Sequence, residues 1–229
     1  MKLSIIIPVY NEKNYILTVL EKVNKQKDKF DIEIIVTDDG STDGTVDIIK
    51  NNKQLYDKAI FNERNEGKGS AIKESLNHVT GDYVLIQDAD LEYNPDEYKN
   101  LISPIIDYNA EIVFGSRFKG GKPERVLYFK NRVANFFLSL LVSILTDINF
   151  SDVETGYKLI KTSKLKSLNL NEKSFGIEIE IVMKLAKTNS NFYEVGISYH
   201  GRTYEEGKKI RFIDGIVALY KVFYYKFFN

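Results

Sequence analysis

The chain has 229 residues, of which 43% are hydrophobic, so it is long enough to bury a sizeable core within one large domain. Its 32 Lys and Arg residues balance 32 Asp and Glu residues, which excludes a net positive field for attracting nucleic acid. The absence of Cys excludes disulfides, thiol catalysis and thiolate metal sites. No apolar run is long enough for a membrane-spanning helix, and the first run is too short for a signal peptide.

The first half of the chain alternates short apolar runs with segments of helical periodicity. The apolar runs predict strands over 3–7, 32–36, 59–61, 83–87 and 111–114, the third of them weaker than the others. Apolar residues at helical spacing predict four helices in this half. One covers 16–23, one begins at about 45, one ends at about 78, and one covers 95–108. Strands that alternate with helices predict an α/β fold with a mostly parallel sheet flanked by helices.

Four of these strands are followed by polar clusters, which are Tyr10-Asn11-Glu12, Asp38-Asp39, Asp88-Ala89-Asp90 and Ser116-Arg117. In a parallel sheet the carboxyl ends of the strands meet at one edge, and ligands bind in the crevice beyond it. A sheet does not need acidic side chains there for its own stability. The pattern therefore predicts a binding site formed by all four strand ends.

Three carboxylates, those of Asp88, Asp90 and Glu92, lie within five positions. They repel one another unless a cation lies among them or some take up protons. Hard oxygen ligands at this density suit Mg²⁺ or Mn²⁺. The structural alternative is a solvated acidic turn before the helix that Asn94 and Pro95 begin. Neither a dinucleotide-binding glycine pattern nor a Walker-type phosphate loop is present.

The second half of the chain is more apolar and carries local basic residues. Helices are expected over 125–146, 175–186 and 212–228, and a strand over 191–199. Aromatic residues mixed with lysines in the last segment are typical of a helix at a membrane interface, with packing on the core as the equal alternative. We interpret 1–229 as a single domain. Its half 1–118 holds a nucleotide and its half 119–229 holds a second substrate, with apolar helices.

Five motifs in the first half occur in the order and spacing of a known family. They are Pro8-Val9-Tyr10-Asn11-Glu12, Asp38-Asp39-Gly40-Ser41-Thr42-Asp43-Gly44-Thr45, Gly67-Lys68-Gly69-Ser70-Ala71, Asp88-Ala89-Asp90 and Gly115-Ser116-Arg117. The chain resembles glycosyltransferase family 2, of GT-A fold. Segments 157–158, 175–180 and 199–210 are similar to those of the dolichol-phosphate mannose or glucose synthases and their bacterial polyprenyl-phosphate relatives.

The resemblance implies roles for individual residues. The residues expected to bind the nucleotide sugar are Pro8, Tyr10, Glu12, Asp39, Lys68, Asp88, Lys208 and Lys209. Metal ligation is implied for Asp88 and Asp90, with Glu92 as a third candidate where mannose synthases often carry Gln. The cofactor would be Mg²⁺ or Mn²⁺. The residues with implied catalytic roles are Asp90, Arg117, Arg132 and Arg202.

The implied activity is inverting transfer of a hexose from a UDP-glucose or GDP-mannose type of donor to a polyprenyl or dolichyl phosphate. The expected partners are the nucleotide sugar, the lipid phosphate and the cytoplasmic face of a membrane, contacted peripherally, with no nucleic acid. One alternative is a glycan or other hydroxyl acceptor, which needs a general base. The candidates for that base are Asp152, Glu154, Glu178 and Glu180. A more distant alternative is a protein that binds a nucleotide sugar without turnover.

Overall fold

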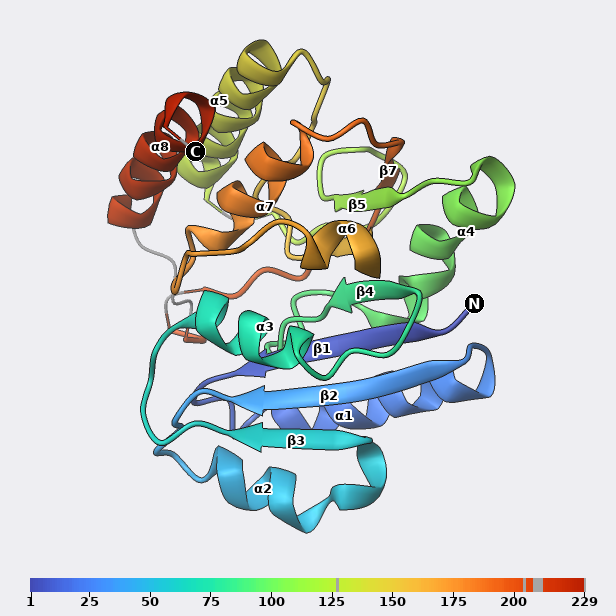
Figure 1. Ribbon diagram of the computed structural model, residues 1–229. Coiled ribbons are helices and arrows are strands. Elements are labelled where there is room, and N and C mark those ends of the chain that lie inside the picture. Colours follow the sequence, from blue (N-terminus) through green and yellow to red (C-terminus); the bar gives the residue numbers. More distant parts are fainter. Residues whose placement is uncertain (127, 204, 208–211, 229) are drawn as a thin grey trace.

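The computed structural model describes residues 1–126, 128–203, 205–207 and 212–228. In that part of the chain, a seven-stranded sheet has helices on both faces (Figure 1). The strands are β1 (Leu3–Val9), β2 (Ile32–Asp38), β3 (Lys58–Phe61), β4 (Tyr83–Ile86), β5 (Ile112–Ser116), β6 (Lys158–Lys161) and β7 (Phe192–Gly196). Their order across the sheet is β3-β2-β1-β4-β6-β5-β7.

Eight α-helices and three short 3₁₀ turns connect the strands in the described part of the chain. The helices are α1 (Ile16–Lys25), α2 (Thr45–Asn51), α3 (Lys68–Leu76), α4 (Tyr98–Tyr108), α5 (Phe129–Thr146), α6 (Thr162–Lys166), α7 (Ile177–Leu185) and α8 (Phe212–Phe227). The 3₁₀ turns are η1 (Gln26–Asp28), η2 (Lys53–Leu55) and η3 (Pro95–Glu97). As expected, Asn94 caps the last turn by accepting a hydrogen bond from the backbone N–H of Asp96 (3.2 Å).

Strand β1 lies in the middle of the parallel part of the sheet. Leu3 pairs with Ile32 of β2 on one side and with Tyr83 of β4 on the other. All seven residues of β1 are buried, because helices cover both faces of a parallel sheet. This burial explains why β1 is a continuous apolar run rather than an alternating one.

Strand β6 is the element that sequence patterning missed. It runs antiparallel to both β4 and β5 and lies between them, whereas the other pairings are parallel. Only two apolar residues, Leu159 and Ile160, separate its terminal lysines, so the run is too short to stand out. The prediction of a mostly parallel sheet is confirmed. Because β6 is reversed, its first residue, Lys158, lies at the edge where β4 ends.

The helices cover two separate cores. Helices α1, α2 and α4 pack on one face of the sheet, and α3, α6 and α7 pack on the other. All nine residues of α7 are buried, because α8 packs against α7 and α5 packs in turn against α8 (Figure 1). Helix α8 contributes Val222 and Tyr225 to this core but leaves Phe223 and Phe227 exposed. Some apolar residues of α8 are therefore buried in the core, and others are exposed at the surface.

Candidate active site

The carboxyl ends of β1, β2, β4 and β5 point to the same edge of the sheet (Figure 1). Glu12 follows β1, Asp39 follows β2, Asp88 and Asp90 follow β4, and Arg117 follows β5. These are the polar clusters that the sequence placed in one crevice. The edge therefore gathers four acidic side chains and a largely buried arginine from segments far apart in sequence.

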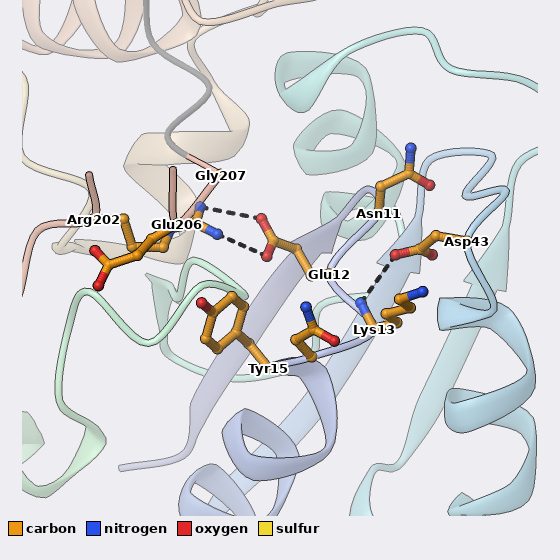
Figure 2. A pocket seen from close by; sticks show the side chains of 9 residues that line it. Asn11, Glu12, Lys13, Tyr15, Asp43, Arg202, Glu206 and Gly207 are labelled. Carbon is orange, nitrogen blue, oxygen red and sulfur yellow. Dashed lines mark hydrogen bonds and ion pairs between the residues drawn. The ribbon is translucent and has the colours of Figure 1, made fainter. Parts of the chain in front are cut away.

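A pocket of about 190 Å³ lies at the end of β1 (Figure 2). Pro8 is buried within β1, and Tyr10 is partly exposed just beyond it. Asn11 has a positive φ of 50°, and its side-chain oxygen accepts a hydrogen bond from the backbone N–H of Thr42 (2.8 Å). The loops after β1 and β2 are thereby joined. The residues that line the pocket are Asn11, Glu12, Lys13, Asn14, Tyr15, Asp43, Arg202, Glu206 and Gly207.

Asp39 is buried and organises a neighbouring loop. Its carboxylate accepts hydrogen bonds from the backbone N–H groups of Glu66 (3.1 Å) and Gly67 (2.6 Å), and from the side-chain amide of Asn62 (3.0 Å). Gly40 follows at φ 75°, where a Cβ would lie 2.5 Å from the backbone of Arg64. A nucleobase bound by Asp39 would therefore share a carboxylate that already holds the 64–67 loop.

Arg202, for which the family resemblance implied a catalytic role, lies among carboxylates that follow β1 and β4. Its guanidinium donates to both oxygens of Glu12 (3.0 and 3.2 Å) and to Asp90 (3.0 Å), as Figure 2 shows for Glu12. The Nε atom lies 3.6 Å from Glu92. Burial opposes the charge of Arg202, but Asp90 and Glu12 raise its pKa above the ordinary value. Arg202 thus forms ion pairs between the second half of the chain and the first.

The segment from Asp88 to Glu92 folds back on itself at Leu91, which has φ 61°. The backbone N–H of Glu92 donates to Asp90 (3.2 Å), and the Glu92 carboxylate accepts from the Tyr199 hydroxyl (2.7 Å). Asp88 points instead toward Lys68, 2.6 Å away. The three predicted metal ligands therefore lie side by side but are oriented toward two different cations.

Electrostatics at Asp90 favour an additional cation. Burial, followed by the nearby charges of Glu92 and Asp88, raises the pKa of Asp90 to about 7, although Arg202 acts in the opposite direction. Among the described residues, no group of three acidic or histidine side chains is arranged to hold a metal ion. The incompletely compensated carboxylate oxygens nevertheless fit Mg²⁺ or Mn²⁺ in chemistry, with Asp88 and Asp90 as the residues that would hold it.

Lys68, at the first position of α3, belongs to an ionic chain that the sequence did not reveal. Its ammonium group lies between Asp88 (2.6 Å) and Glu178 of α7 (2.8 Å). Glu178 also binds Lys158, the first residue of β6. Sequence reasoning missed this chain because β6, which carries Lys158 to the site edge, was not predicted.

Arg117 lies behind the pocket in a buried ion pair. Its Nε and Nη2 atoms donate to the two oxygens of Asp152, each at 2.7 Å, and its backbone N–H donates to the same carboxylate (3.0 Å). The guanidinium also lies 5.1 Å from the ring centroid of Tyr199. Two of the nitrogens expected to grip a phosphate are therefore engaged within the protein.

Arg132 lies in the first turn of α5. Its side chain is 61% exposed, and it forms an ion pair with Glu124 (3.0 Å). The guanidinium lies 5.5 Å from the ring centroid of Phe118, which Arg117 also approaches at 5.6 Å. Phe118 thus links the exposed Arg132 to the buried Arg117. The other two predicted cations, Lys208 and Lys209, lie outside the described residues.

Of the four candidate bases, one differs from the rest. Asp152 binds Arg117, Glu178 binds two lysines, and Glu180 binds Lys184 (2.8 Å) and two backbone N–H groups. Atom Oε1 of Glu154 is buried and has no hydrogen-bond partner among the described residues. Burial raises the pKa of Glu154 to about 7. Glu154 is therefore the acid in this set that is best suited to accept a proton near neutral pH.

An exposed apolar surface covers α5 and α8, which pack side by side (Figure 1). We call it the α5/α8 surface. Its exposed members are Phe129, Phe136, Phe137, Leu140, Ile144, Ile213, Ile216, Val217, Leu219, Tyr220, Phe223 and Phe227. In the described part of the chain, no helix has both the length and the apolar character needed to cross a membrane.

Comparison with known proteins supports an assignment to a family. A model described as glycosyl transferase family 2 matches residues 4–168. An uncharacterized protein of Methanocaldococcus jannaschii is 32% identical over 224 residues, which are 90% of this chain and 93% of that protein. The dolichol-phosphate mannosyltransferase of Pyrococcus furiosus is 28% identical, over 92% of this chain and 61% of that enzyme. Glycosyltransferase AglJ of Haloferax volcanii is 27% identical, over 86% of this chain and 63% of that protein.

This chain therefore spans less than two thirds of the length of either of these two transferases. Among solved structures, glucosyl-3-phosphoglycerate synthase of Mycobacterium tuberculosis, in complex with Mn²⁺, UDP and phosphoglyceric acid, matches with a TM-score of 0.77. The match covers 100% of this chain and 79% of that chain at 18% identity, so it supports the fold alone. The expected GT-A architecture is confirmed by this likeness. Because the family model covers most of its length, the chain belongs to glycosyl transferase family 2.

Proposed function

We propose that this protein transfers a hexose, with inversion, from a UDP- or GDP-sugar to a polyprenyl or dolichyl phosphate. The observation that carries the proposal is the position of the first turn of α5. It presents Arg132 next to Phe118, the residue that also contacts Arg117 at the end of β5, and the same helix continues into the exposed α5/α8 surface. A phosphate at that turn would have its lipid chain beside an apolar surface.

The donor would bind along the ends of β1, β2 and β4. Tyr10 and Glu12 lie where a nucleoside would meet the loop after β1, with Pro8 shaping the strand end and Asp39 holding the next loop. Lys68 would meet the diphosphate. Two crystal structures of one protein of similar fold support a donor of this class. Glucosyl-3-phosphoglycerate synthase was crystallised with Mn²⁺ and UDP-glucose, and also with Mg²⁺ and UDP.

The transfer needs charge stabilisation more than it needs a base. A lipid phosphate is already an anionic nucleophile near pH 7, so it attacks the anomeric carbon opposite the leaving diphosphate without losing a proton. Negative charge builds on that diphosphate, and Lys68 and Arg202 neutralise it. Mg²⁺ or Mn²⁺ held by Asp88 and Asp90, with Glu92 beside them, would supply further stabilisation of the same charge. Arg132 orients the acceptor phosphate at the first turn of α5.

Membrane attachment completes the proposal. Apolar side chains on α5 and α8, with Lys221 and Lys226 among them, suit a helix pair that lies in the headgroup region. We place the protein peripherally on the cytoplasmic face of a membrane, where nucleotide sugars and lipid phosphates would meet.

Donor binding can be tested by thermal shift with UDP- and GDP-sugars, each with Mn²⁺ or Mg²⁺. A donor at about a hundred times its Kd adds about 2.7 kcal/mol of stability. For a domain of this size that raises Tm by about 5–10 °C. If no nucleotide sugar raises the Tm, the proposal is wrong.

The acceptor can be tested by transfer to a short polyprenyl phosphate, with the corresponding polyprenyl alcohol as the control acceptor. We expect Arg132→Ala to lower transfer by about ten- to hundredfold, because it removes a charged hydrogen bond to the phosphate, while donor affinity stays unchanged. Lys161→Ala is the matched variant. Lys161 is also exposed and ion-paired, with Glu111 at 3.5 Å, but it lies at the opposite edge of the sheet. Unchanged activity of Arg132→Ala would remove Arg132 from the acceptor site.

Glu154 favours a second candidate function, transfer to a hydroxyl acceptor. Its buried, unpartnered oxygen and raised pKa are what a general base requires. The synthase with the similar fold was crystallised with phosphoglyceric acid, an acceptor class that carries a hydroxyl. If this candidate is right, Glu154→Gln abolishes transfer. If the acceptor is a lipid phosphate, Glu154→Gln remains active.

A further inference from the structure

Four side chains of alternating charge form a continuous chain from the core to the candidate metal site. Lys158 binds Glu178, Glu178 lies 2.8 Å from Lys68, and Lys68 lies 2.6 Å from Asp88. The members come from four elements, which are β6, α7, α3 and the loop after β4. The formal charges of the four groups sum to zero.

The inner half of this chain is fixed in the core. Lys158 is fully buried, its ammonium group also binds the carbonyl of Thr155, and it lies 5.5 Å from the ring centroid of Phe114. Glu178 stands in the first turn of α7, every residue of which is buried. Charges in such surroundings are weakly screened, so removing one of them changes the field felt by the others.

Glu178 cannot act as the base considered from the sequence. Burial alone would raise its pKa, but the ammonium groups of Lys158 and Lys68 lower the pKa to about 2. The carboxylate therefore stays charged at neutral pH and accepts no proton from an acceptor hydroxyl. Its two oxygens bind two different lysines, which is an arrangement for holding and balancing cations.

We propose that Glu178 is a positioning residue that holds Lys68 on Asp88 and balances its charge, with Lys158 as the fixed anchor. Without Glu178, the charge of Lys68 would be uncompensated beside the residues that would bind a divalent cation. The site would then attract an anionic diphosphate but repel the metal that should accompany it. With Glu178, the same lysine can contact the diphosphate while the metal remains bound. The inference rests on the proposed nucleotide-sugar and metal site.

The test measures Mn²⁺ affinity without nucleotide and UDP or GDP affinity without metal, both by calorimetry, on folded protein well below its Tm. Glu178→Gln adds one positive charge to the chain. We expect Mn²⁺ to bind on the order of tenfold more weakly and the nucleotide to bind more tightly. The matched double variant, Glu178→Gln with Lys158→Met, restores the charge sum, and both affinities should return to within about threefold of the wild type.

Changes of opposite sign in the Mn²⁺ affinity and the nucleotide affinity distinguish this proposal from simple damage to the fold. If Glu178→Gln weakens both ligands alike, or changes neither, the proposal is wrong. Should Glu178→Gln fail to fold, Lys158→Met alone provides the test, because it removes a positive charge. It should tighten Mn²⁺ and weaken the nucleotide, and any other outcome overturns the proposal. If the wild-type chain binds neither ligand, the proposed function itself fails, and this inference fails with it.

Discussion

Replacement of Arg117 by Met tests whether this arginine holds the fold or the substrate. Arg117 is nearly buried, and its guanidinium binds both oxygens of the fully buried Asp152 at 2.7 Å. Loss of one partner of a buried ion pair costs about 3–5 kcal/mol, because the other charge remains without compensation. At about 2–4 °C per kcal/mol for a domain of this size, Tm should fall by about 6–20 °C.

The assay is differential scanning calorimetry on the wild type and on a matched variant, Arg125→Met. Arg125 forms an equally short ion pair with Glu206 (2.7 Å), but both side chains are about one third or more exposed. Exposed pairs contribute about 0–1 kcal/mol, so this variant should melt within a few degrees of the wild type. Equal melting temperatures for the two variants, together with loss of transfer only in Arg117→Met, would refute the structural role. Arg117 would then act on a substrate phosphate.

Two further predictions concern pH and membranes. The pKa of Glu154 rises from 4.5 to about 7 on folding, so the native state holds the extra proton and stability falls as pH increases from about 4.5 to 7. Glu154→Gln should abolish this loss, at most about 3 kcal/mol by urea titration, and an unchanged pH profile would contradict it. Phe137→Glu combined with Phe227→Glu should lower binding to anionic liposomes at least tenfold, because two apolar side chains no longer bury in the interface and the new carboxylates are repelled by anionic lipid. The control Ile106→Glu replaces an equally exposed apolar residue on α4, and an equal effect there would rule out a specific α5/α8 surface.

Much of the fold could be predicted because local and global signals agree. Apolar runs mark β1 and β2, whose residues are buried except for Glu33 of β2. The helix at 95–108 begins with the cap that Asn94 and Pro95 indicated. The missed strand, β6, is short and ends in lysines, and its partners are distant in sequence. A strand of this kind is specified by its neighbours in the sheet, which no local pattern records.

The site was predictable in position but not in its internal pairing. Because parallel strands end at one edge, Glu12, Asp88 and Asp90 could be grouped from the sequence. The resemblance implied that Arg202 belongs to the site, but sequence could not show which carboxylates it would bind, since more than 100 positions separate it from each of them. The difference between an exposed Arg132 and a buried Arg117 was equally hidden, because burial depends on how the second half packs.

The pairing also changes how the two halves of the chain should be understood. The half 119–229 was expected to hold the acceptor, yet it supplies partners for Glu12, Asp90 and Glu92 at the edge where β1 and β4 end. Arg202 compensates Glu12 and Asp90, Tyr199 donates to Glu92, and Glu178 shares Lys68 with Asp88. Removing those partners would leave several buried charges without compensation, which costs more than any surface contact. The candidate site is therefore formed by both halves of the chain, and residues of 119–229 set part of the charge that the proposed donor and metal would encounter.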